Sequence, residues 1–374
     1  MFELEKIKKQ LQPLDETACQ AAVERQGQLL KPEGSLGLLE DISIRMAGIT
    51  GKVKNSADKK ILFLFGADNG VYEEGIASAP QEFTHLLMSH YAGTAKCGIN
   101  VICEANQVDL VLVDMGIIGT FEGQNVENHK LMNGTHNFAK QPAMDRETVL
   151  KAIEIGFNYA RYAKDNGYDI IGNGEVGMGN TTTAAACVMA ALNISDPEIA
   201  VGLGAGLTEE AFARKKQVIA DALKKHQPDG KDVVDILSKV GGLDLAAMTG
   251  LYIGAAYYKL PIVIDGVISI AAALLAYRFH PLTKEYMFAS HVSKEPAYRL
   301  AAEEMQLHPM LQLDMRLGEG TGCPIAMRVI DTALAVMREM NTFADVAADT
   351  EYREELAMHR PARRALPNIS FNHP

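Results

Sequence analysis

A glycine-rich segment in the middle of the chain, GNGEVGMGNTTTAAACVMAAL (172–192), holds residues well suited to chemistry. Its first glycines spell GxGxxG between a predicted strand and a predicted helix, which is the pattern of a dinucleotide-binding turn. Two features argue against a dinucleotide: Glu175 would repel a pyrophosphate, and the next apolar segment, VGLGAGL, lacks the acidic residue that would bind the ribose. A single phosphate on the backbone amides of Gly177 to Thr181, at the helix N-terminus, is the simpler hypothesis. The alternative is a tight turn without function, capped by Asn180.

A second glycine-rich turn, GLGAGLTEEAFARKKQ (202–217), also precedes a predicted helix. Thr208 is a suitable N-cap, and Lys215 and Lys216 follow about two helical turns further along. One of these lysines could reach the phosphate of a ligand, although exposed helix lysines are the ordinary alternative. The chain has no GxxxxGK[ST] motif, which argues against a nucleoside triphosphatase.

A third cluster, DMRLGEGTGCPIAM (314–327), places Glu319 between two glycines and ahead of an apolar helix. Its carboxylate could cap that helix or serve as a positioned general base. Glutamate is a poorer N-cap than serine, threonine, aspartate or asparagine, which favours the functional role. The sequence leaves both roles open.

Four apolar runs that end in glycine or an acidic residue supply the scaffold for these turns. Their length and near-continuous apolar character predict strands of a parallel sheet that is buried on both faces. The runs are 61–70, 108–116, 168–175 and 261–266. Helical patterns separate them, at 81–95, 145–166, 181–192, 208–226 and 269–279. This alternation predicts a Rossmann-like α/β fold with helices on both faces. The acids just past the strand ends are predicted to form an active-site rim: Asp68, Asp114, Glu175 and Asp265.

The ends of the chain are mainly helical in pattern, so we predict two domains and an extension. Residues 60–300 form the main α/β domain, which carries the glycine-rich turns of the predicted nucleotide site. Residues 1–59 with 301–350 form a small helical domain, and residues 351–374 are a C-terminal extension outside the core.

Composition excludes several classes of protein. The 374 residues carry a net charge of −11 without a basic block, so nucleic acid and anionic membranes are poor partners. Five scattered cysteines without a CxxC pair predict a cytoplasmic protein without a disulfide framework. No HExxH or GxSxG motif is present, and the strand run VLVDMG offers one acid rather than a metal-binding pair. We therefore expect neither a metal nor a cofactor.

Three motifs occur in an order that resembles one family. KPEGSLG, GMGNTTTAAA and RLGEGTG together are similar to the nicotinate-nucleotide–dimethylbenzimidazole phosphoribosyltransferases of cobamide lower-ligand assembly. The resemblance covers roughly residues 25–345. It implies transfer of the phosphoribosyl group from nicotinate mononucleotide to a lower-ligand base, with inversion at the anomeric carbon. The products would be nicotinate and an α-ribazole 5'-phosphate, and the protein would be a homodimer.

The resemblance also implies roles for individual residues. Glu319 matches the general base, Glu175 an acidic residue near the nucleotide, and Lys215 a lysine that contacts phosphate. The residues assigned to phosphate and ribose are Gly177, Gly179, Asn180, Thr181, Gly204 and Lys215. Those assigned to the base pocket are Asp68, Ala79, Gln81 and Gly320.

Some positions depart from the family pattern, notably Asn69, where histidine is common, and Val292, where arginine is common. These departures bear on the preferred base, and a phenolic acceptor would use the same general base on a hydroxyl group. Two functions of other classes stay open: an NAD-linked oxidoreductase that uses the GxGxxG turn, and a non-catalytic regulator that binds a mononucleotide.

Overall fold

The computed structural model of the protein describes residues 2–348, and it divides into two compact units. The larger unit comprises residues 2–12 and 58–327, and the smaller comprises 13–57 and 328–348. Residues 2–12 and 301–327 thus belong to the larger unit, whereas the sequence analysis predicted that they belong to the small helical domain. The division into functional domains stays a prediction, and the proposed extension 351–374 lies outside the described residues. No helix within residues 2–348 is long and apolar enough to cross a membrane.

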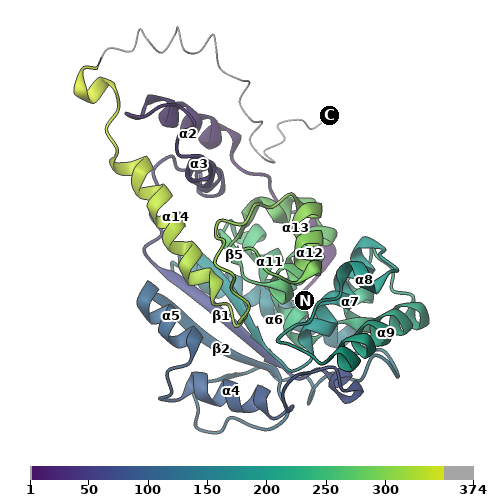
Figure 1. Cartoon of the computed structure of the whole chain (residues 1–374). Coiled ribbons are helices and arrows are strands. Elements are labelled where there is room, and N and C mark those ends of the chain that lie inside the picture. The colour runs from purple at the N-terminus through teal and green to yellow at the C-terminus, as the bar shows by residue number, and fades with distance from the viewer. Residues whose placement is uncertain (1, 349–374) are drawn as a thin grey trace. The chain divides into compact units, whose positions relative to one another are not determined.

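A six-stranded parallel sheet organises the larger unit (Figure 1). Its strand order is β3-β2-β1-β4-β5-β6. Successive strands are added on one side of β1 as far as β3 and on its other side from β4 onward, so the strand order reverses between the neighbouring strands β1 and β4. The strands are β1 Lys60–Ala67, β2 Val108–Gly116, β3 Glu127–Asn128, β4 Ile170–Val176, β5 Ile262–Ile264 and β6 Met287–Ala289. Every residue of β1 and β4 is buried, as expected for central strands covered on both faces. The predicted α/β fold is confirmed.

Helices lie on either side of this sheet (Figure 1). The α-helices of the larger unit are α1 Leu4–Lys8, α4 Phe83–Ala92, α5 Gly98–Asn106, α6 Arg146–Asp165, α7 Asn180–Leu192, α8 Pro197–Ala200, α9 Glu209–His226, α10 Val233–Val240, α11 Leu243–Tyr258, α12 Val267–Phe279 and α13 Pro296–Met305. Short 3₁₀ helices span Gly70–Glu74 and Pro281–Tyr286. The helices predicted from periodicity correspond to α4, α6, α7, α9 and α12, with ends that differ by a few residues.

Helix α11 lies at the centre of the helical packing, against α6 on one side and α12 on the other. Glycines allow the contact with α6. A Cβ atom at Gly156 would lie 1.7 Å from the carbonyl oxygen of Ala247, and one at Gly250 would lie 2.0 Å from that of Ile153. Any larger residue at either position would force the two helices apart.

The smaller unit packs α2 (Glu16–Gln28) against α3 (Leu38–Thr50), and most of α14 (Gly322–Glu339) belongs to it. Asp15 caps α2 by accepting a hydrogen bond of 2.9 Å from the Ala18 amide. The Arg25 side chain donates to the Met337 carbonyl at 2.7 Å, which ties α2 to the end of α14. A 3₁₀ turn at Ala344–Val346 follows.

Candidate active site

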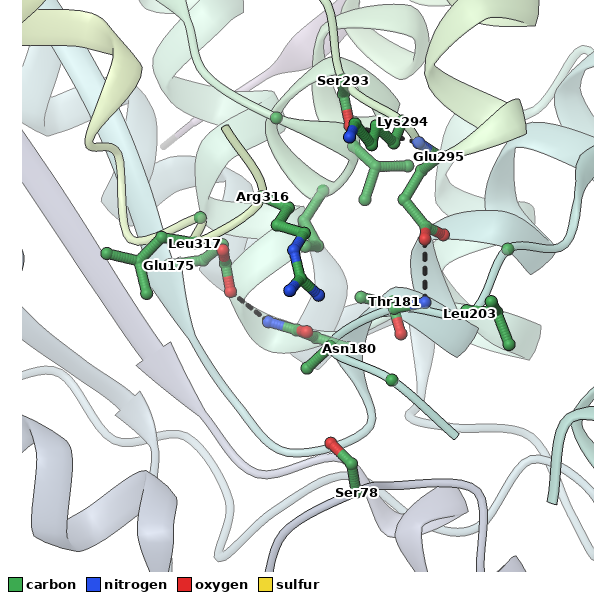
Figure 2. Close-up of a pocket in the computed structure, with 18 of the residues that line it drawn as sticks. Ser78, Glu175, Asn180, Thr181, Leu203, Ser293, Lys294, Glu295, Arg316 and Leu317 are labelled. Atoms are coloured by element: carbon green, nitrogen blue, oxygen red, sulfur yellow. Dashed lines mark hydrogen bonds between the residues drawn. The ribbon is translucent and has the colours of Figure 1, made fainter. Parts of the chain in front are cut away.

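A cavity of about 850 Å³ opens beside the carboxyl ends of β4 and β5. Its wall includes seven of the residues predicted for the site: Ala79, Glu175, Gly177, Asn180, Thr181, Gly204 and Glu319. Figure 2 shows Glu175, Asn180, Thr181, Glu295 and Arg316 around this pocket. Five other predicted residues are not among those that line the cavity: Asp68, Gln81, Gly179, Lys215 and Gly320.

The N-terminus of α7 forms the floor at the GxGxxG turn. Gly179 is the N-cap residue, with φ of 91°, and Asn180 is the first residue of the helix. The N-cap position of α7 is occupied by Gly179, and the Asn180 side chain donates to the Glu175 carboxylate (Figure 2), so the alternative of a turn capped by Asn180 is wrong. The amides of Met178 and Asn180 bond internally, to Thr84 Oγ1 and to the Gly177 carbonyl. Within residues 2–348, the amides of Gly179 and Thr181 make no hydrogen bond and are available to an anion.

The two candidate lysines have separate environments. Lys215 of α9 is fully buried, and its Nζ donates to Thr181 Oγ1 at 3.0 Å and to the Gly202 carbonyl at 2.9 Å. Burial lowers the pKa of Lys215 to about 8, an effect that the nearby Glu295 partly opposes. Lys216 points elsewhere, forming an ion pair of 2.7 Å with Glu198. Lys215 is therefore the lysine beside the glycine turns.

The second glycine turn is held by a carboxylate. The Gly204 amide donates to Glu295 Oε1 at 2.8 Å (Figure 2). Thr208 caps the following helix, as predicted, by accepting from the Ala211 amide at 3.2 Å. Glu295 precedes α13 and was not singled out from the sequence, because a glutamate in a polar loop carries no distinctive pattern.

Glu175 belongs to a buried cluster of acids. It ends β4, and burial together with Asp244 and Asp265 raises its pKa to about 8. Asp244, in the first turn of α11, is fully buried, and burial raises its pKa to about 7. Asp244 was missed in the sequence; the available signal was a single acid in an otherwise apolar helix.

Asp265 builds the loop that carries Glu319. It follows β5, and its carboxylate accepts from the Gly320 amide at 3.0 Å and from the Gly322 amide at 2.7 Å. These bonds fix the start of α14, so Asp265 rather than Glu319 performs the capping role that the sequence left open.

Glu319 itself has φ of 61°, between Gly318 at 78° and Gly320 at 81°. A left-handed conformation is unfavourable for glutamate, and such strained residues cluster at functional sites. Burial and the neighbouring Asp265 raise the pKa of Glu319, whereas the facing Tyr91 hydroxyl lowers it. A buried carboxyl group whose pKa is moved towards neutrality is suited to general base catalysis.

Of the four acids at the sheet edge, Glu175 alone is among the residues that line this cavity. Asp68 accepts from the Ile118 amide at 2.8 Å, and burial raises its pKa; Gln81 and Thr84 face its carboxyl group. Asp114 accepts from the Ile117 amide at 2.8 Å and forms an ion pair of 3.3 Å with Lys130. The four acids therefore do not form one common rim around the pocket.

Asn69 and Val292, two of the positions that depart from the family pattern, also have distinct environments. Asn69 is buried and accepts from the Thr183 hydroxyl at 3.1 Å, which ties the end of β1 to α7. Val292 is exposed and makes no contact that bears on the pocket. Within residues 2–348, no group of three or more His, Cys, Asp or Glu side chains is arranged to hold a metal ion.

Comparison with known proteins places this architecture in a family. A family model described as Phosphoribosyltransferase matches residues 11–347. The nicotinate-nucleotide–dimethylbenzimidazole phosphoribosyltransferase of Clostridium perfringens (strain 13 / Type A) is 46% identical over 354 residues, covering 94% of this chain and 97% of the relative. The chain belongs to the nicotinate-nucleotide–dimethylbenzimidazole phosphoribosyltransferase family.

Other members of this phosphoribosyltransferase family agree. The Clostridium tetani enzyme of the same name is 41% identical over 350 residues, covering 93% of this chain and 96% of that protein. A crystal structure of the same-named enzyme from Thermus thermophilus is 34% identical with a TM-score of 0.85, and covers 90% of this chain and all of the other. The resemblance inferred from the three sequence motifs is confirmed.

Proposed function

We propose that the protein transfers the phosphoribosyl group of nicotinate mononucleotide to a benzimidazole-type base, releasing nicotinate and forming an α-ribazole 5'-phosphate. The relatives carry this activity in their names. The observation that supports it best is the strained Glu319, whose loop is fixed by Asp265 and which faces the same cavity as the α7 N-terminus. One pocket thus combines an anion site with a candidate general base.

The phosphate is bound at the end of the pocket nearest α7. The amides of Gly179 and Thr181 and the positive end of the helix supply neutral donors. Lys215 lies within 3.0 Å of Thr181 Oγ1 and adds a positive charge. A bound phosphate would stabilise the protonated lysine and raise its pKa above the value of about 8.

Bond cleavage needs little assistance at the leaving group. The electron pair of the C1'–N bond moves to the pyridinium nitrogen, which becomes a neutral pyridine. Positive charge then develops on the ribose, and carboxylates stabilise such a centre. We assign this role to Glu175, which lines the cavity and accepts from Asn180 at the start of α7. A cation beside Glu175 would lower its raised pKa and favour the ionised form.

The acceptor completes the exchange. Its unprotonated nitrogen attacks C1' on the face opposite to the leaving nicotinate, and a new C–N bond forms. The proton on its other ring nitrogen passes to the Glu319 carboxylate, which restores neutrality in the product base. Such proton transfer contributes about 10²–10⁴-fold to the rate. We assign four residues to the base pocket: Ala79, which lines the cavity, and Asp68, Gln81 and Gly320.

The decisive experiment incubates the protein with nicotinate mononucleotide and a panel of benzimidazoles, purines and phenols. We expect nicotinate release that requires a benzimidazole and yields one ribazole phosphate per nicotinate. Release that requires p-cresol instead would identify a phenolic acceptor. Binding of nicotinate mononucleotide without any release would indicate a regulator, and binding of NAD with hydride transfer an oxidoreductase; either result would overturn the proposal.

We also propose, from the family resemblance, that the protein is a homodimer, which sedimentation analysis would test. A cytoplasmic location is supported by the five cysteines, all of which are free thiols. Detection of the native protein in the cytoplasmic fraction of its source cells would test it.

A further inference from the structure

Arg316 is a pocket residue that the proposed reaction does not yet use. It lies on the loop that carries Glu319, and Figure 2 shows its guanidinium directed into the cavity, towards Glu175 and Asn180. Within residues 2–348, Arg316 makes no hydrogen bond and no ion pair. An arginine has five donors, and one that points into a pocket without a partner is suited to bind an anionic group of a ligand.

The other charged side chains on the wall have partners, and that of Glu319 is the Tyr91 hydroxyl. The Glu295 carboxylate holds the Gly204 amide, and Glu175 accepts from Asn180. Lys294, the other lysine or arginine on the wall, forms an ion pair of 3.3 Å with Asp314. Arg316 is thus the free cation among the wall residues that the structure describes.

We propose that Arg316 binds the carboxylate of the nicotinate ring and thereby selects nicotinate mononucleotide over nicotinamide mononucleotide. This inference rests on the proposed function, because the ring must occupy the pocket. The phosphate already has donors at Gly179, Thr181 and Lys215, whereas the ring has none. Arg316 lies three residues before Glu319, and both line the cavity together with Glu175.

The chemistry favours a carboxylate as the partner. The planar guanidinium fork matches the two oxygens of a carboxylate and forms paired, charge-assisted hydrogen bonds. An uncharged amide would offer a single weaker acceptor and would leave the positive pyridinium near Arg316 without compensation. Selection therefore combines attraction for the acid with repulsion of the amide.

The test compares wild type with Arg316→Met, Arg316→Lys and the matched control Lys294→Met. Steady-state kinetics with both mononucleotides give kcat/KM, and calorimetry gives the Kd of free nicotinate, nicotinamide and inorganic phosphate. For Arg316→Met we expect kcat/KM for nicotinate mononucleotide to fall about 10- to 100-fold, the size of a lost charge-assisted pair. The value for nicotinamide mononucleotide should stay constant or rise, and Arg316→Lys should be intermediate. Lys294→Met should preserve the preference for the acid.

Three outcomes would overturn the inference. They are an equal loss of kcat/KM with both mononucleotides, an unchanged Kd for nicotinate, and a selective loss of phosphate binding, which would place Arg316 at the other end of the substrate. If wild type turns over neither nucleotide with any base, the proposed function fails separately. The nicotinate titration of Arg316→Met still decides the carboxylate site in that case. Thermal unfolding of each variant confirms that the comparison is made between folded proteins.

Discussion

The carboxyl edge of the parallel sheet has two sides with similar acids and different tasks. On the β1–β2 side, Asp68 and Asp114 accept hydrogen bonds from the amides of Ile118 and Ile117. On the β4–β5 side, Glu175 faces the cavity and Asp265 fixes the loop of Glu319. In the sequence, each of these acids follows or ends an apolar strand run, so the pattern alone does not separate them.

The difference arises from the segment that comes after each strand. After β2 comes a loop that must be held in place, and Asp114 and Lys130 hold it. After β4 comes a helix N-terminus, and after β5 comes an acid that anchors a distant segment of the chain. A ligand site forms where anion-binding amides and a positioned carboxylate share one cavity. The lesson is that an acid at a strand end acquires a role from the segments packed against it.

The largest expected effect tests the β4–β5 side directly. Glu319→Gln should lower kcat by about 10²–10⁴-fold, because the amide cannot accept the proton of the attacking base. The Kd of both substrates, measured by calorimetry, should change little, since the amide has nearly the shape of the acid. A variant that retains near-wild-type kcat would contradict the role of Glu319.

Asp265→Asn tests how the same side positions its base. Asparagine offers one acceptor oxygen where Asp265 uses two, so the amide of Gly320 or of Gly322 loses its partner. We expect kcat to fall about 100-fold, as for a small displacement of a reacting group. The negative charge of Asp265 also raises the pKa of Glu319, so the acid limb of the pH–kcat profile should move to lower pH. A loss of kcat with an unmoved limb would indicate a purely structural role.

The paired variants Lys215→Met and Lys216→Met test the phosphate end. Lys215→Met should lower kcat/KM for nicotinate mononucleotide about 10- to 100-fold, because a charge-assisted bond to phosphate is lost. Lysine is charged below its pKa, and burial lowers the pKa of Lys215 to about 8. In wild type, kcat/KM should therefore decline as the pH rises through about 8, and Lys215→Met should lack this decline. Lys216→Met, which removes an ion pair with Glu198, should keep both the rate and the decline.

Only some of the strands and helices could be predicted from the sequence. The long apolar runs and the strongly periodic helices were predictable because burial on both faces or on one face leaves a clear pattern. The edge strands β3 and β6, of two and three residues, were too short to leave one. Helix α11 was missed because it is buried on all sides and so has no polar face.

The candidate site divides in the same way. Glycine spacing pointed to the α7 turn and to Glu319, because a left-handed backbone and a close approach both require glycine nearby. Asp244 and Glu295 come from segments far apart in the chain, and only the fold brings Asp244 close to Glu175 and Glu295 to the pocket wall. The choice between Lys215 and Lys216 depended on which face of α9 is buried. The roles of Asp265 and Asp114 depended on hydrogen bonds to backbone amides, which no residue pattern specifies.

The smallest effect on activity is expected for a variant on the β1–β2 side of the sheet edge, Asp114→Asn. Asp114→Asn keeps an acceptor for the Ile117 amide but removes the ion pair with Lys130, whose side chain is largely buried. The loss should lower the free energy of unfolding by about 1–3 kcal/mol, the size of a charge-assisted hydrogen bond, while Lys130 keeps its hydrogen bond to the Gly119 carbonyl. The folded variant should retain the kcat and KM of wild type, because the loop it holds does not line the cavity. Denaturant unfolding and steady-state kinetics on the same sample measure both quantities. Asp114→Asn could instead lose as much activity as Asp265→Asn without losing stability. The acids on both sides of the sheet edge would then contribute to catalysis, which would contradict the purely structural role of Asp114.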